Sequence, residues 1–348
     1  MKNYFLCISF IAICLSACTF SETKKDDRID PAIKKQIHAL DNIIVEGLVE
    51  NKPEKVLAVC NDRLLAKKGE IMLLMQALNG MLKTEQFKIM NEYYQKNASK
   101  KNVGVVSSGK KGDHDYQIRY EARYKEMYVV VGCFEDTRDQ KCFTFIYGKS
   151  GDNWKLNSMQ AGILKIMNKD AIDWYLMAKK EYEKGYLIDA MCHMGISSQL
   201  LKPGSHQWQY QKENEIEVFE QKVTKQTYAK YPFPLTVDSV KTKPVIFRVY
   251  SQAITEGYFP LILYTTTIDL HNISKLSNEC NEIHKNIGKL FKGIDSNNKI
   301  ILYRPYKSIP TGTETTTKQY GFLRKTKQPL SGISGNNIAL KDSSKSHL

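Results

Sequence analysis

One segment has the residue types and spacing that could bind a phosphate group. Residues 104–111, GVVSSGKK, fit the GxxxxGK pattern, in which backbone amides hold the phosphates and a hydroxyl residue after the lysine holds magnesium. Lys111 stands where that hydroxyl residue is required, and the following residues alternate as in a strand instead of starting a helix. We therefore interpret 104–111 as a loop before a sheet, and we expect no nucleotide cofactor.

A second pattern has the spacing of a metal site. Cys280 and His284 lie four residues apart, which lets two side chains of one helix meet the same ion. Cys280 also belongs to an apolar stripe, and the neighbouring residues offer no second ligand pair at a recognised spacing. The expectation is a packed Cys280, a flanking surface position for His284, and no metal.

Tyr116, Tyr120 and Tyr124 could form an aromatic face for a sugar or a peptide. They lie four residues apart in a predicted strand, so they share one side of it, and flat rings bind such ligands at low entropic cost. Arg119 and Arg123 fall between them and give the strand a charged outer face. The alternative is that the tyrosines fill the core under the helices, because aromatic residues favour strands.

Cys133 and Cys142 could form a disulfide. They bracket FEDTRDQK between two apolar runs, which is a hairpin pattern with a polar turn. If the turn centres between Thr137 and Arg138, the two cysteines face each other across the strands. The remaining cysteines after residue 18 fall on apolar helical stripes, where a buried free thiol is expected; they are Cys60, Cys192 and Cys280.

Cys18 has a different chemistry, because it ends an uncharged apolar run that starts at Tyr4. This run is shorter than the roughly 20 residues that span a bilayer, so residues 1–17 are typical of a signal peptide. Its last residues, Leu15-Ser16-Ala17-Cys18, resemble the lipobox of bacterial lipoproteins. The resemblance implies that Cys18 becomes the mature N-terminus and carries acyl chains that anchor it in membrane lipid. The alternative is an ordinary secretory peptide cleaved near Ala17.

The residues after Cys18 bear on where in the cell envelope the chain is located. Thr19 stands where the Gram-negative sorting rule places an aspartate for inner-membrane retention, so the outer membrane is favoured. Residues 18–29 are polar, and we expect a flexible lipidated tether. Lys24-Lys25-Asp26-Asp27 is similar to the surface-export signals of Bacteroidetes lipoproteins but lies further from the cysteine. Periplasmic and surface-facing orientations therefore both stay open.

The charge of the chain limits its partners. With 51 Lys and Arg against 37 Asp and Glu, the formal net charge is +14, and a basic balance can attract nucleic acid. The envelope address excludes that partner, so we expect membrane lipid through Cys18 and, beyond it, an acidic glycan, lipopolysaccharide or an envelope protein. The lysines form no dense cluster, and a generally basic surface is the simpler alternative.

The elements that must position these residues indicate an α+β fold. Residues 30–165 are expected to form helices, one from Asp30-Pro31 and a third over about 71–94, packed on an antiparallel meander. That order resembles the nuclear-transport-factor-like α+β roll, a superfamily with many non-catalytic binding modules. Residues 166–235 predict a helical connector, with a third helix from about Trp208, and about 170–205 resemble a single tetratricopeptide hairpin.

The last folded part is expected at 240–324, a small α+β domain of ββαβ type. Residues 325–348 are rich in Ser, Gly, Asn and Lys and predict a disordered tail.

No nucleophile-elbow or paired-acid signature accompanies the seven histidines. The sequence therefore favours non-catalytic binding or scaffolding at the envelope. The alternative is a secreted hydrolase acting on cell-wall glycan or peptide, with a site assembled between domains.

Overall fold

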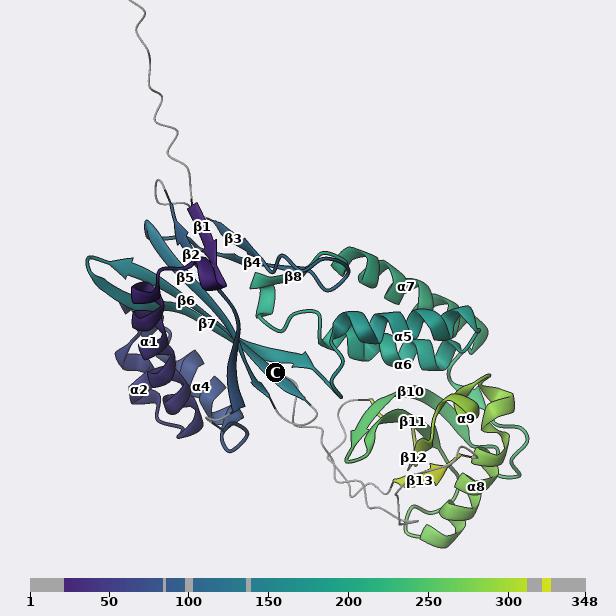
Figure 1. Cartoon of the computed structure of the whole chain (residues 1–348). Coiled ribbons are helices and arrows are strands. Elements are labelled where there is room, and N and C mark those ends of the chain that lie inside the picture. Colours follow the sequence, from purple (N-terminus) through teal and green to yellow (C-terminus); the bar gives the residue numbers. More distant parts are fainter. Residues whose placement is uncertain (1–21, 84–85, 98–102, 136–138, 312–320, 327–348) are drawn as a thin grey trace, which may run out of the picture.

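A five-stranded antiparallel sheet organises the N-terminal half of the protein (Figure 1). The computed structural model describes residues 22–83, 86–97, 103–135, 139–311 and 321–326. The sheet has the order β1-β2-β5-β6-β7. Its strands are β1 (Glu22–Lys25), β2 (Phe87–Lys96), β5 (Glu126–Glu135), β6 (Gln140–Ser150) and β7 (Asn153–Lys165).

Helices cover one face of this sheet (Figure 1). Asp30 starts the first of them, because its side chain accepts a hydrogen bond from the Ala32 amide and Pro31 follows it. The apolar stripe Ile37, Ile44 and Leu48 then packs on the sheet in one hydrophobic cluster. The helices are α1 (Pro31–Val49), α2 (Pro53–Ala58), α3 (Asp62–Leu65) and α4 (Lys68–Leu78).

A three-stranded antiparallel sheet and two helices cover the opposite face. Tyr116 of β4 stacks on Trp208 of β8 with ring centroids 3.8 Å apart, and both rings share a cluster with Val129 and Val131 of β5. The small sheet has the order β3-β4-β8. Its strands are β3 (Gly104–Ser107), β4 (Tyr116–Tyr120) and β8 (Trp208–Tyr210). The two helices are α5 (Ala171–Glu183) and α6 (Leu187–Gln199), which precede β8, and α7 (Glu213–Lys230) follows β8.

A second five-stranded sheet, in the order β13-β12-β11-β10-β9, forms the C-terminal part. The expected ββαβ order is confirmed, with β11 and β12 paired in parallel. The α8 stripe, which includes Cys280, packs on this sheet together with Ile188 of α6. The elements are β9 (Leu235–Thr236), β10 (Val245–Ile254), β11 (Gly257–Thr265), α8 (Ile273–Leu290), α9 (Ile294–Asn297), β12 (Ile300–Tyr306) and β13 (Phe322–Lys325).

The α+β fold is as the sequence predicts, but several segments differ from expectation. Residues 104–107 of the expected loop over 104–111 form β3, paired with β4. The helix expected over about 71–94 ends at Leu78, since Asn79 leaves the helical region and Gly80 takes a φ of +74°. Residues 87–96 form β2 instead, and this strand is hydrogen-bonded to β1 on one side and to β5 on the other. The helix expected from about Trp208 starts at Glu213, and 208–210 pair with β4.

The flexible tether expected over 18–29 is also wrong for most of its length. Glu22 to Lys25 form β1, paired with β2, and a short 3-10 helix over Asp26–Arg28 follows. Ile29 is buried in the core under α1. The folded body therefore begins no later than residue 22. The lipidated residue expected at Cys18 lies outside the described residues. The disordered tail expected over 325–348 begins too early, because Lys325 is the last residue of β13, and the rest of that tail from 327 lies outside the described residues.

Gly162 marks a close approach between β7 and the loop that leads to β8. A Cβ atom added there would lie 2.5 Å from the carbonyl oxygen of Pro203. Gly162→Ala is therefore expected to lower the free energy of unfolding by about 1–3 kcal/mol in a urea denaturation experiment. Gly195→Ala is the control, because nothing lies within 4 Å of a Cβ at this position of α6. That variant should be neutral or more stable by about 0.5–1 kcal/mol, and equal losses in both variants would contradict the packing.

Candidate functional site

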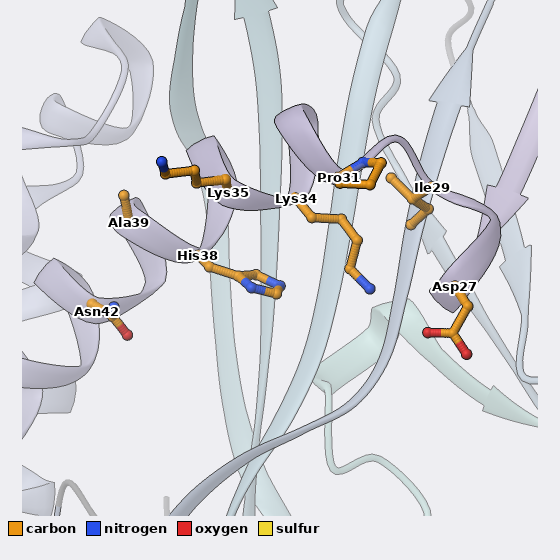
Figure 2. Close-up of a pocket in the computed structure, with 8 residues that line it drawn as sticks. All are labelled: Asp27, Ile29, Pro31, Lys34, Lys35, His38, Ala39 and Asn42. Atoms are coloured by element: carbon orange, nitrogen blue, oxygen red, sulfur yellow. The ribbon is translucent and has the colours of Figure 1, made fainter.

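A surface hollow of about 670 Å³ lies where the chain passes from the short 3-10 helix into α1. Figure 2 shows Lys34 and His38 projecting from successive turns of α1 toward the same side, while Lys35 points away. Asp27 lies across from Lys34 in the same view. The i,i+4 spacing puts a cation and an imidazole side by side.

Glu92 of β2 lies beneath these two side chains. One of its carboxylate oxygens lies 2.6 Å from Lys34 Nζ, and the other lies 2.8 Å from His38 Nε2. Tyr128 of β5 donates its hydroxyl hydrogen to the same oxygen as His38, at 2.6 Å. The carboxylate is 6% exposed, so α1 and two strands meet at one buried acid.

The hydrogen bonds decide the charge of this acid. Burial acts to raise the pKa of Glu92, but the hydrogen bonds from Lys34, Tyr128 and His38 outweigh it and hold the pKa below its usual range. The bond to Glu92 likewise raises the pKa of Lys34. The pair is therefore ionised at neutral pH, and removal of Lys34 would leave the buried Glu92 carboxylate with only the hydrogen bonds to His38 and Tyr128.

Asp41 lies on the same face of α1, about one turn after His38. One of its oxygens accepts a hydrogen bond from the Tyr147 hydroxyl at 2.5 Å, and the other has no partner among the described residues. Burial raises the pKa of Asp41 to about 7, and the bond from Tyr147 only partly opposes this. The site thus combines a carboxylate that stays charged with one that exchanges a proton near neutral pH.

The His38 and Glu92 pair has the geometry in which a carboxylate orients an imidazole for proton transfer. Within the part of the chain that the structure describes, no serine, threonine or cysteine side chain is bonded to His38. The contacts that are present hold α1 on the sheet and keep a charged group beneath a solvent-facing hollow.

Three further histidines join separate elements. His114 lies 2.7 Å from Asp170 and 3.8 Å from Asp173, a trio close enough to hold a metal ion. The two carboxylates already cap α5 through a reciprocal capping box. His193 contacts Glu181 at 2.7 Å. The structural role accounts for these contacts without a metal.

His284 is half-buried and not a free surface residue. Its two ring nitrogens contact the Tyr303 hydroxyl at 2.9 Å and the Lys325 carbonyl at 3.1 Å. Burial lowers its pKa. Cys280 is buried in the core, as expected.

The tyrosine face expected on β4 points into the protein. Tyr116 and Tyr120 are 2% and 4% exposed, and their hydroxyls donate to Asn91 and to Gln95 of β2. Tyr124 is half-buried and covers Gly148. These rings cannot form the ligand face considered from the sequence, because the small sheet turns them against the large one. The charged residues of the opposite side, such as Arg119, are left at the surface.

Cys133 and Cys142 are directly opposite each other on β5 and β6, so the predicted register is confirmed. Both are buried free thiols in the structure, and the disulfide stays a prediction. Cys60, Cys192 and Cys280 are buried free thiols as well. The polar cluster at Glu92 was missed at the sequence level. The available signal was the spacing of Lys34, His38 and Asp41 on one helix face.

The chain matches no protein-family model, no curated protein and no solved structure. The likeness to the nuclear-transport-factor-like roll and to a tetratricopeptide hairpin therefore stays an expectation from the order of the elements. Function has to be argued from this chain's own residues.

Asp41→Asn is expected to change how stability depends on pH. Between the ordinary pKa of 3.8 and the folded value of about 7, the folded state holds a proton that the unfolded state releases, so the stability contributed by this group falls as the pH rises. An asparagine does not ionise. The variant should therefore gain about 2–3 kcal/mol over wild type between about pH 5 and about pH 8.

Urea denaturation across this pH range measures the gain. The control is Asp152→Asn, at an exposed position in the β6–β7 turn, whose difference from wild type should stay constant with pH. A constant difference for Asp41→Asn would mean that its carboxyl titrates normally in the folded protein.

The opposed cysteines predict a bridge in protein made in an oxidising compartment. Antiparallel partners directly across from each other have the Cα separation that a disulfide requires. Protein folded under oxidising conditions and purified without reductant, then unfolded and alkylated, should leave Cys133 and Cys142 unlabelled while Cys192 is labelled. Cys142→Ser should make Cys133 reactive. Full labelling of Cys133 in the wild type would show that the pair stays reduced.

Proposed function

We propose that the protein is a lipid-anchored component of the bacterial cell envelope, held at the outer membrane rather than the inner one, whose folded body acts by binding. The observation that carries the proposal is Leu15-Ser16-Ala17-Cys18 at the end of an apolar signal segment. Thr19 after the cysteine favours the outer membrane. Acyl chains on Cys18 would make the attachment effectively permanent.

The position of β1 limits how far the folded body can lie from an acylated Cys18. Only three residues separate Cys18 from Glu22, the first residue of β1, so the connection spans at most about 14 Å. Such an anchor would hold the β1 end of the large sheet close to the lipid surface. The C-terminal sheet lies at the opposite end of the molecule (Figure 1). Within the described ranges, no helix has the length and apolar character needed to cross a bilayer.

The contacts of four histidines join elements of the fold, which favours a structural role for these histidines over a catalytic one. His38, His114, His193 and His284 each contact a partner on another element. Ser205 and His206 are adjacent, with Ser205 Oγ 3.3 Å from His206 Nδ1, but His206 is exposed and no carboxylate is bonded to it in the described part of the chain. A hydrolase of the serine or cysteine type needs a nucleophile hydrogen-bonded to a base, and the base in turn hydrogen-bonded to an orienting group.

A second candidate is the secreted hydrolase acting on cell-wall glycan or peptide. One observation favours it, the orientation of the His38 ring by Glu92 beside a hollow. This site would lie between α1 and the large sheet instead of between domains. Incubation of purified peptidoglycan with wild type and with His38→Gln tests it. Release of fragments by the wild type alone would favour the hydrolase over the binding protein.

The anchor is tested by growing cells with a clickable fatty acid. Wild-type protein should carry the label and sediment with membranes, whereas Cys18→Ala should lose both, because no other thiol stands at the cleavage site. Cys7→Ala is the matched control, since this cysteine lies inside the segment that is removed. An unlabelled wild-type protein would refute the lipid anchor.

A further inference from the structure

A second hollow, of about 750 Å³, lies between the helices α3 and α4 on one side and the end of β4 on the other. We call it the β7 trough, because Asn157 to Ala161 of β7 contribute to its lining. β7 is the outermost strand of the large sheet. The trough is separate from the hollow over Glu92 and shares no lining residue with it.

A β-bulge at Asn157 shapes this lining. Tyr147 of β6 pairs with Leu156 and Ile146 pairs with Ser158, so Asn157 is the extra residue between two ladder pairs. Bulges of this kind re-aim a side chain. Here the Asn157 side chain turns toward α3, where its carbonyl oxygen accepts a hydrogen bond from Asn61 at 2.8 Å.

Amide and hydroxyl groups gather around that position. Gln207 donates to the Ser158 hydroxyl at 3.3 Å, and Gln160 approaches the same hydroxyl at 3.5 Å. Neutral side chains of this kind, each offering both a donor and an acceptor, suit a ligand rich in hydroxyl groups.

Two of these side-chain amides each have one polar atom without a hydrogen-bond partner. The side-chain nitrogen of Asn157 and the side-chain oxygen of Gln207 are buried and have no partner among the described residues. Gln207 as a whole is 8% exposed. A buried polar atom without a partner is costly, and a hydroxyl group can accept a hydrogen bond from an amide nitrogen and donate one to an amide oxygen. A metal ion or an apolar ligand could not satisfy both.

The rim of the trough is cationic. Four basic side chains and two acidic ones line it. Arg63 and Arg123 share the single carboxylate of Glu121, which leaves their combined charge in excess. Arg119 is exposed and has no hydrogen bond or ion pair with any described residue. Guanidinium groups bind carboxylates and phosphates through two parallel hydrogen bonds.

Apolar side chains complete the wall on the helix side. Leu64, Ile71 and Leu74 of α3 and α4 face Met159 of β7 across the lining. A pocket with apolar walls and a few convergent polar groups is the usual form of a small-ligand site. The C–H faces of a sugar ring would lie against this wall.

We infer that the β7 trough binds an anionic saccharide, with Asn157 and Gln207 bonded to ring hydroxyls and Arg119 bonded to a carboxylate or phosphate on the sugar. The inference rests on the part of the proposed function that assigns a binding role to the folded body, and it names the site and the ligand class. In an envelope, such a group occurs on lipopolysaccharide and on cell-wall glycan, and the experiment below separates these sources.

The test uses the purified full-length protein in detergent and isothermal titration calorimetry. The first probe is tetragalacturonic acid, and its methyl ester is the matched ligand with the same ring but no charge. The acid should bind and the ester should bind at least about tenfold more weakly, because it loses the charge-assisted bonds. Higher salt should weaken the acid selectively. Equal affinity for both sugars would overturn the inference.

Two variants locate the site. Arg119→Gln and Gln207→Met should each weaken binding of the acid roughly tenfold. Arg248→Gln, at an exposed arginine on β10, is the control and should bind as wild type does. Thermal unfolding should be the same in all three. Unchanged affinity in Arg119→Gln and Gln207→Met would show that the ligand does not bind in the β7 trough.

The remaining arms identify the source and the class of the ligand. Purified lipopolysaccharide and soluble peptidoglycan fragments should compete to different degrees, and the stronger competitor names the source. Tetraglutamate has the charge without the hydroxyls. If tetraglutamate binds as tightly as the sugar acid and with the same sensitivity to Arg119→Gln, the trough takes an acidic peptide and the saccharide inference is wrong.

The outcomes also separate this inference from the lipid anchor. Loss of fatty-acid labelling in Cys18→Ala concerns only the anchor, and that variant should bind the sugar acid normally. A labelled protein that binds none of the probes would leave the anchor standing and overturn the assignment of the trough.

Discussion

Burial of β5 on both faces is the constraint on which the N-terminal architecture depends. Every residue from Met127 to Phe134 is buried, with Tyr128 and Val130 in the cluster under the helices and Val129 and Val131 in the cluster under the small sheet. A strand of this kind needs an apolar layer on each side. The helices α1 to α4 supply one layer. The β3-β4-β8 sheet, with α5 and α6, supplies the other.

This constraint explains where the polar chemistry lies. Where α1 crosses the large sheet, Glu92 and Asp41 are taken out of water, and each needs hydrogen bonds to offset the cost of burial. Glu92 has three such bonds and stays charged, whereas Asp41 has one and titrates near neutral pH. On the other side, the second layer turns the β4 tyrosines inward. Arg119 of the same strand and Arg123 just after it are then left at the surface, where both line the β7 trough.

The positions of β1 and of the C-terminal sheet follow from the same arrangement. β1 pairs at the outer edge of the large sheet and begins close to Cys18, so this edge is the part that an acylated cysteine would hold at the lipid surface. The C-terminal sheet is attached through α6, whose Ile188 and Cys192 pack in its core. A ligand in the β7 trough would contact only the N-terminal layers. The proposed anchor and the proposed binding site would then both belong to the N-terminal layers.

The sequence by itself determined the features that depend on local pattern. The 3.6-residue period and the Asp30-Pro31 cap predicted α1, and the alternation at 116–124 predicted β4. A polar turn centred between Thr137 and Arg138 predicted that Cys133 and Cys142 face each other, and the stripe through Cys280 predicted α8. The resemblance of Leu15-Ser16-Ala17-Cys18 to a lipobox is likewise a linear pattern, and lipidation of Cys18 stays a prediction. Only the tertiary structure decided which face of β4 is buried, because a period of two leaves both faces equivalent until a second layer covers one. It also decided that 87–96 form a strand and that Glu92 meets Lys34 and His38. These pairings join residues 30 or more positions apart, so nothing in local spacing encodes them.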